Sequence, residues 1–149
     1  MITKYTGSKI IAFDKLWIEK DREKPIPKDA AGWAYVRSIA QVQVLNSLCS
    51  GASVVYDDNN PKRQHRDELR NLATKAGVNS IIIYLDTSLD IIRSREQANI
   101  ISQDRHEVQP QDFKKVLADM EIPTPEEGRV LIFTPETNLD EFLKRLSSF

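Results

Sequence analysis

The sequence has little of what marks secreted and membrane proteins. Its 149 residues contain one cysteine, Cys49, so no disulfide can form within the chain. No stretch approaches the run of about 18 apolar residues that a membrane-spanning helix needs, and the N-terminus lacks the apolar core of a secretion signal. We therefore expect a cytoplasmic protein, with Cys49 as a small buried hydrophobe.

An excess of charge of either sign is also absent. Lysine and arginine number 21 and aspartate and glutamate 22, a net charge of −1, which gives no general attraction to nucleic acid or to an anionic membrane. His65 and His106 are isolated, so no spacing of metal ligands is present. With 40% hydrophobic and 29% charged residues, the composition is typical of a globular protein, and residues 1–149 are predicted to form a single domain.

Four short apolar runs predict the strands of a mostly parallel sheet. They cover residues 9–13, 53–57, 80–86 and 130–133. The three isoleucines of the third run predict a strand that is covered on both faces. Because helical patterns alternate with these runs, the expected fold is a three-layer α/β domain with helices on both faces of the sheet.

Capping residues and prolines set the expected ends of the helices. Asp29 precedes a long helix that Gly51 ends, and Asn138 precedes the last helix, with Glu141 in an imperfect capping box. Further helices are expected over 61–76, 89–98 and 110–120, the first of them with a solvated charged face. Residues 1–7 look like the end of a helix, 15–28 like a loop or a broken short helix, and 99–107 like a mobile loop.

Acidic side chains follow two of the predicted strands. Asp14 ends the first, and Asp57 and Asp58 end the second, at the edge where open α/β sheets bind ligands. Asp57 and Asp58 are hard to explain as helix caps, because one of the two must point back toward the sheet. Asn60 caps the next helix or faces the site. Near the start of the long helix, Tyr35 and Arg37 are within reach of a ligand, although a solvated surface explains Arg37 equally well.

Five features in this order resemble one family. They are Phe13-Asp14-Lys15, the run from Ser50 to Asn60 with its glycine, apolar strand and Asp-x-x-Asn, then Arg95, Arg105, and Ile122 to Gly128, which is similar to a Pro-x-x-Glu-Gly connector. Nearly the whole chain resembles the P-loop kinases of the polynucleotide-kinase-like group, often labelled an AAA-type ATP-binding domain. That group includes zeta-toxin-like and small-molecule phosphotransferases.

The resemblance implies an ATP-dependent kinase that uses magnesium and transfers a phosphoryl group to a hydroxyl acceptor. Asp14 would take the proton of that hydroxyl, and Asp57 would hold the acceptor or the magnesium shell. Asn60 would orient the loop beside it, and Arg95 and Arg105 would close over the nucleotide phosphates as lid arginines. Arg95 has a second interpretation, which is local pairing with Asp90 or Glu96 on its own helix. Asp58, with Tyr35 and Arg37, completes the expected substrate-binding set.

One departure from the family changes this expectation. No Gly-x-x-x-x-Gly-Lys-Ser/Thr occurs, and Gly7-Ser8-Lys9 is no substitute because it has one glycine and leads into a strand. The expected sheet therefore lacks its first, central strand and the phosphate loop. Met1 internal to a longer protein explains this, as does a degenerate family member, or a partner chain that supplies the missing parts. At position 17 a tryptophan stands where some members carry a substrate-binding arginine.

Three functions remain open at this point. The chain is part of a kinase, inactive in isolation, or a non-catalytic module that binds a nucleotide or another ligand. The third is a structural subunit whose exposed strand edges pair with another chain, which can be a second copy in a homo-oligomer.

Overall fold

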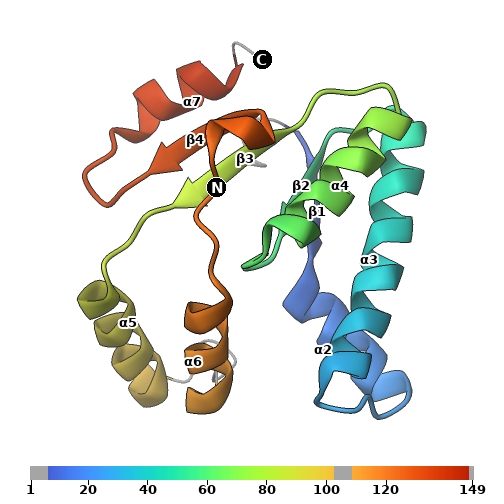
Figure 1. Cartoon of the computed structure of the whole chain (residues 1–149). Coiled ribbons are helices and arrows are strands. Elements are labelled where there is room, and N and C mark those ends of the chain that lie inside the picture. The colour runs from blue at the N-terminus through green and yellow to red at the C-terminus, as the bar shows by residue number, and fades with distance from the viewer. Residues whose placement is uncertain (1–6, 103–108, 148–149) are drawn as a thin grey trace. The chain divides into compact units, whose positions relative to one another are not determined.

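The structure is a computed structural model that describes residues 7–102 and 109–147. Helices and short parallel strands alternate along the chain (Figure 1), as the apolar runs predict. The chain divides into two compact units. The first holds β1 (Lys9–Ala12), α2 (Phe13–Glu23), α3 (Ala30–Cys49), β2 (Val54–Asp57) and, from Gln64, α4 (Arg63–Lys75). The second holds β3 (Ile81–Leu85), α5 (Leu89–Ser102), α6 (Pro110–Asp119), the 3-10 turn η1 (Pro125–Glu127), β4 (Arg129–Phe133) and α7 (Leu139–Ser147).

In the first unit, β1 and β2 form a parallel two-stranded sheet. The register aligns Lys9 with Val54 and Ala12 with Asp57, so the two strands end level at their carboxyl ends. Both strands pack against α3, and α2 lies along α3 (Figure 1). The buried core of the unit consists of Ile11, Phe13, Leu16, Ile26, Val36, Ala40 and Val44.

Helix α2 occupies a segment for which the sequence predicted a loop or a broken short helix. Eleven residues form a continuous helix, because Pro25 and Pro27 follow its last residue, Glu23, and interrupt nothing. Phe13 and Trp17, one turn apart, turn toward α3, where Trp33 stacks on Phe13 with ring centroids 6.1 Å apart. The consequence for the site is that β1 ends at Ala12, and the next carboxylate belongs to a helix.

Helix α3 begins as predicted. Asp29 Oδ1 accepts hydrogen bonds from the backbone N–H groups of Ala31 and Gly32, which caps the helix. Gly32 is required by a close approach, because a Cβ atom there would lie 1.9 Å from the carbonyl oxygen of Pro27. The helix ends at Cys49, which is exposed, so the prediction of a buried thiol is wrong. The thiol is on the outer side of the last turn, and Ser47 is buried instead.

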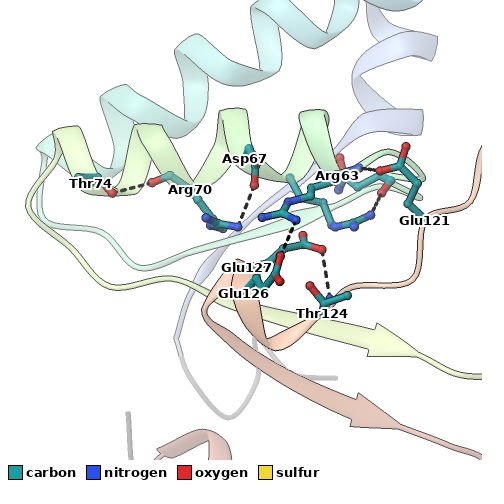
Figure 2. A network of polar contacts seen from close by, with 10 residues as sticks. Arg63, Asp67, Arg70, Thr74, Glu121, Thr124, Glu126 and Glu127 are labelled. Atoms are coloured by element: carbon teal, nitrogen blue, oxygen red, sulfur yellow. Dashed lines mark hydrogen bonds and ion pairs between the residues drawn. The ribbon is translucent and has the colours of Figure 1, made fainter.

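Helix α4 differs from its prediction at its start and on one face. It begins at Arg63, so Pro61 is not its first residue and Asn60 is not its N-cap. The expected local ion pairs occur on part of the helix, where Arg70 Nη1 lies 2.8 Å from Asp67 Oδ1 (Figure 2). Arg66 contradicts the expectation of a solvated face: it is only 6% exposed, since its guanidinium turns inward to donate to a backbone carbonyl.

In the second unit, β3 and β4 form another parallel pair. Ile81 lies opposite Arg129 and Leu85 opposite Phe133. The three isoleucines are half-buried, so the expected cover on both faces is not what the structure has. Behind β4, Phe142 of α7 is fully buried and meets Phe133 edge to face, with centroids 5.1 Å apart. Asn138 Oδ1 accepts a hydrogen bond from Glu141 N, which confirms the predicted cap.

Two other predictions about helix ends have different outcomes. Helix α5 continues to Ser102, past the predicted end at Ala98, so the first residues of the expected loop are helical. The rest of that loop and the expected helix end over residues 1–6 lie outside the described residues. No helix in the part of the chain that the structure describes combines the length and the apolar character needed to cross a membrane.

Candidate functional site

The carboxyl ends of β1 and β2 bring three acids to one edge of the first unit. Asp57 is the last residue of β2 and pairs in register with Ala12, the last residue of β1. Asp14 follows two residues later, in the first turn of α2. Asp14 and Asp57 are both exposed. Asp58 directly follows Asp57, in the loop that leaves β2. The structure therefore brings together carboxylates that are more than 40 residues apart in the sequence.

Asp58 is the acid that its surroundings alter most. Burial raises the pKa of its carboxyl group to about 6, although the Asn59 N–H and the positive charge of Arg37 act in the opposite direction. The negative charge of Asp14 adds to the rise. The N–H of Asn59 donates to Oδ1 at 2.8 Å, and the hydroxyl of Tyr56 donates to Oδ2 at 3.5 Å. Both oxygens of Asp58 therefore already have a donor.

Tyr56 is held as a neutral donor in this cluster. Burial raises the pKa of its phenol well above the ordinary value, and the negative charge of Asp58 raises it further. A phenol with so high a pKa keeps its proton at any physiological pH. Tyr56 therefore serves Asp58 as a fixed hydrogen-bond donor.

Arg37 connects α3 to α4 through His65. Its Nη1 atom lies 3.0 Å from Nε2 of His65. Its Nε atom is buried and has no hydrogen-bond partner among the described residues. One turn further along both helices, Gln41 Nε2 donates to Glu68 Oε2 at 2.8 Å, so the two helices are linked twice. Arg37 is thus part of a polar cluster and not a solvated surface residue.

Asn60 shapes the loop after Asp58. Its φ angle is +41°, a left-handed conformation that asparagine tolerates better than most residues. The buried guanidinium of Arg66 donates through Nη1 to the carbonyl oxygen of Asn60 at 3.0 Å. The side chain of Asn60 donates to the carbonyl oxygen of Asp58 at 3.4 Å. Asn60 therefore stabilises the loop through its backbone carbonyl and its side-chain NH2 group.

The remaining predicted site residues have different outcomes. Tyr35 lies on α3 and is 53% exposed, and within the described part of the chain no hydrogen bond joins it to the acidic cluster. Arg95 is exposed on α5, in the second unit. Arg105 lies outside the described residues. The structure thus gathers Asp14, Asp57, Asp58, Arg37 and Asn60, and describes no gathering of the other three with them.

Two members of the cluster were missed from the sequence. Tyr56 was regarded only as part of an apolar strand, and His65 as an isolated histidine. No local pattern identifies His65, because its partner Arg37 is 28 residues away in the sequence. For Tyr56 the two-residue spacing to Asp58 was a usable signal, since alternate residues of a strand lie on one face.

The connector before β4 is ordered by its own acids. Thr124 and Glu127 form a capping box, in which the Glu127 carboxylate accepts from the backbone N–H of Thr124 at 3.2 Å (Figure 2). The adjacent Glu126 pairs with Nη1 of Arg63 at 3.0 Å. Glu121 accepts from the backbone N–H of Arg63 at 2.9 Å. These contacts hold the run that resembles the family connector, all within the second unit.

The chemistry of the donors decides which cofactors this chain fits. Two exposed carboxylates, Asp14 and Asp57, suit magnesium, which binds through one or two carboxylates together with substrate oxygens and water. A larger ligand set is absent from residues 7–102 and 109–147, where no cluster of three potential metal ligands occurs. Lys9 is not placed to bind the phosphates of ATP, because it lies in β1 and its ammonium group donates to Ser47 Oγ at 3.0 Å.

The hollow beside α2 does not include the acidic cluster. It is lined by residues such as Ile10, Lys15, Glu19 and Gln43, and by neither Asp57 nor Asp58. It therefore adds no group to the site.

Sequence comparison gives one family. Residues 11–123 match the family model of the AAA domain. No curated protein is significantly similar to the chain in sequence.

Several solved kinase structures share the fold. A Chloroflexus aurantiacus protein designated a kinase matches with a TM-score of 0.77 and 17% identity, over 99% of this chain and 86% of that chain. A gluconokinase from Sinorhizobium meliloti matches with a TM-score of 0.64 and 21% identity, over 99% and 83%. For a Mycobacterium tuberculosis APS kinase, in complex with AMPPNP and APS, the values are 0.65 and 16%, over 98% and 82%. At these identities the likeness concerns the fold.

Proposed function

The chain belongs to the AAA domain family, and from this premise we propose that it acts in ATP-dependent transfer of a phosphoryl group to a hydroxyl acceptor. The observation that carries the proposal is the gathering of Asp14, Asp57, Asp58 and Arg37 at the carboxyl ends of two parallel strands. Phosphoryl transfer is catalysed mainly by positioning and charge, and needs a carboxylate at the attacking hydroxyl. The similarity of the fold to solved kinase structures supports interpreting these residues as part of a phosphoryl-transfer site.

Asp14 is the residue we assign to the acceptor proton. Its carboxylate is exposed in the first turn of α2, so a hydroxyl group can approach it. Asp58 is less suited, because both of its oxygens already accept hydrogen bonds. As the acceptor oxygen forms its bond to the γ-phosphorus of ATP, the bond from that phosphorus to the departing ADP breaks, and the hydroxyl proton moves to a carboxylate oxygen of Asp14.

Asp57 is the residue we assign to magnesium or to the acceptor. Magnesium, when bound, neutralises charge on the phosphates that react. We propose that Asn60 orients the loop and that Tyr35, Arg37 and Asp58 contact the acceptor. Arg95 and Arg105 are proposed as lid arginines over the nucleotide phosphates, a role that their charge suits.

The donor phosphates need a loop that these 149 residues do not contain. We therefore assign this chain the acceptor end of the reaction and no residue that cradles the donor phosphates. The related proposal of a sheet without its central strand is supported by the pairing within the described residues, where β1–β2 and β3–β4 are separate two-stranded sheets. In each pair, both outer strand edges lack a further described strand.

Those edges also support a second candidate, a structural subunit that pairs with another chain, such as a second copy, through one of them. Light scattering that gives a monomer at micromolar concentration contradicts it. A third candidate, a non-catalytic binding module, keeps the acceptor end without turnover.

Replacement of Asp14 tests the proposal. In a protein whose phosphate loop is supplied by a longer chain or by a partner, we expect Asp14→Asn to lower phosphoryl transfer from labelled ATP to a panel of sugars, nucleosides and 5′-hydroxyl oligonucleotides by about 10²–10⁴-fold. The matched control is Glu19→Gln, which removes the same charge from an exposed position of the same helix and leaves the rate unchanged. Transfer that survives in Asp14→Asn contradicts the role of Asp14. A wild-type protein that binds an acceptor without phosphorylating it supports the binding module instead.

A further inference from the structure

We propose that the hydroxyl acceptor of this site is a nucleoside, whose base stacks on the indole rings of Trp33 and Trp17 beside Asp14. The inference rests on the proposed function and names the class of compound that the acceptor end takes. The residues that carry it belong to α2 and α3, within the first unit. It depends on where three aromatic rings lie and on which of them solvent reaches.

Three aromatic rings form one continuous cluster between α2 and α3. The ring centroids of Trp17 and Trp33 are 5.3 Å apart. The centroid of Phe13 lies 6.3 Å from that of Trp17 and 6.1 Å from that of Trp33. Separations of roughly 4.5–7 Å are those of favourable aromatic pairs. Each ring therefore supports the other two, and the cluster presents a held aromatic surface instead of one flexible side chain.

The three rings differ in their exposure to solvent. Phe13 is 2% exposed and belongs to the buried core of the unit. Trp17 is half-buried, and Trp33 is 37% exposed although two other rings contact it. Phe13 thus anchors the cluster in the core, and Trp33 is the ring that a ligand from solvent reaches most easily.

Helix spacing places these rings next to the residues of the acceptor end. Trp17 follows Asp14 by three residues on α2, and Arg37 follows Trp33 by four residues on α3. Side chains three or four positions apart are neighbours on a helix surface, with Cβ atoms roughly 5–6 Å apart. The two tryptophans, in contact with each other, therefore join Asp14 on one helix to Arg37 on the other. A ligand whose flat ring covers the tryptophans and whose hydroxyl group meets Asp14 spans adjacent parts of one surface.

The chemistry of this surface favours a nucleoside among hydroxyl compounds. A nucleobase has a π-face that stacks on an aromatic side chain, and its ribose carries the hydroxyl groups that phosphoryl transfer needs. A hexose has hydroxyl groups but no π-face. Asp14 and Asp57 are both exposed at the ends of neighbouring strands, so a phosphate group on the acceptor would meet two negative charges. A neutral nucleoside is therefore the acceptor that suits both the rings and the acids.

Binding of nucleosides to the chain, without ATP, tests the inference. Trp17 and Trp33 are its two tryptophans, so NMR follows two indole N–H signals. We expect adenosine to shift both, with a dissociation constant of about 1 mM or lower. Glucose should shift neither, and adenosine 5′-monophosphate should bind more weakly than adenosine. A wild-type protein that binds neither adenosine nor guanosine at several millimolar, or that binds glucose or the monophosphate as well as adenosine, overturns the inference.

Replacement of Trp33 separates stacking from packing. Trp33→Leu keeps an apolar side chain without a π-face, and we expect it to weaken adenosine binding by about 5- to 150-fold. Trp33→Phe keeps an aromatic ring and should retain most of the affinity. Val42→Ala, at an apolar position of α3 that is 58% exposed, is the control that leaves binding unchanged. Equal affinities of Trp33→Leu and Trp33→Phe would overturn stacking.

A measurement on the wild type keeps the test decisive should Trp33→Leu not fold. A base that stacks on an indole ring has its proton signals moved upfield by the ring current, and we expect this shift for the base protons of bound adenosine. Bound adenosine without that shift would contradict stacking.

The binding measurement needs no phosphate donor, so it separates this inference from the proposed function. In a protein whose phosphate loop is supplied by a longer chain or by a partner, transfer to another acceptor without nucleoside binding overturns the inference and leaves the kinase proposal in place. Stacking of adenosine in such a protein without any transfer supports the inference and contradicts the kinase proposal. Where adenosine is phosphorylated, Trp33→Leu should raise its KM by the factor seen in binding, with a smaller change in kcat.

Discussion

Among single residues, Asp58 shows how one position can cost stability and serve a site. Its carboxyl group is half-buried. Burial and the negative charge of Asp14 both disfavour the ionised form of this group. The donors of Asn59 and Tyr56 and the charge of Arg37 offset part of this cost. An amide here would keep one acceptor oxygen and a polar NH2 group without carrying a charge, so ionisation of Asp58 has a cost that asparagine would avoid.

This explanation predicts a pH dependence of stability. The pKa of Asp58 is raised from 3.8 to about 6 by burial, so between these values the folded protein binds a proton that the unfolded chain has released. The free energy of unfolding therefore falls as pH rises through this window, by at most about 3 kcal/mol. We expect Asp58→Asn to remove this part of the slope and to be more stable than wild type at pH 7. Urea unfolding at several pH values between about 4 and 7 measures both proteins.

Other carboxylates titrate in the same window, so the difference between the two proteins is the relevant quantity. The carboxamide oxygen of asparagine can still accept from the N–H of Asn59, and its NH2 group can donate to the hydroxyl oxygen of Tyr56, so each of the two positions keeps a hydrogen bond. Parallel pH profiles for wild type and Asp58→Asn would contradict the raised pKa.

Among the structural elements, the connector from Thr124 to Gly128 contains two neighbouring glutamates with different environments. Glu127 is 2% exposed and closes the capping box with Thr124 (Figure 2). The side chain of Glu126 is 76% exposed and pairs with Arg63, whose side chain is 43% exposed. Glu127 therefore makes its contact from a buried side chain, whereas both partners of the Glu126 ion pair are open to solvent, which weakens the pair.

We therefore expect Glu127→Ala and Glu126→Ala to differ in stability. The first removes a buried carboxylate and opens the capping box with Thr124, and should cost about 1–2 kcal/mol. The second removes a surface ion pair and should cost less than about 1 kcal/mol. Thermal and urea unfolding of the two variants measures the difference, and an equal loss would show that the capping box contributes nothing.

For the whole molecule, the question is whether these 149 residues hold a nucleotide. They contain no phosphate-binding loop, and Lys9 is engaged with Ser47 within the first unit. Backbone amides in a glycine-rich loop and a lysine provide the main contacts to the β- and γ-phosphates of a nucleotide in this class of fold. Without them, exposed arginines remain, and exposed charges bind phosphate weakly.

We accordingly expect no binding of ATP with magnesium tighter than about millimolar in calorimetric titration of the chain. Lys9→Met should leave the result unchanged, because the ammonium group of Lys9 donates to Ser47. Micromolar affinity in the wild type would contradict this account of the missing loop. Loss of that affinity in Lys9→Met would identify Gly7-Ser8-Lys9 as a phosphate site after all.

The sequence by itself determined the alternation of strands and helices, the caps at Asp29 and Asn138, and the acids after β1 and β2. Local preferences encode all of these, because periodicity and capping depend on residues within one or two turns. It missed helix α2, since prolines just past its end were taken to interrupt it. The exposed Cys49 and the buried Arg66 were missed because both lie on helix faces that apolar periodicity does not distinguish well.

Only the tertiary structure decided which side chains meet. Arg37 reaches His65 across 28 residues, and the charge of Asp14 acts on Asp58 from another element. Such pairs follow from the packing of helices and strands on one another, which no local spacing in the sequence specifies. Local interactions thus set the elements and their polar ends, and packing set the environment that changes the pKa of Asp58 and holds Arg37 against His65.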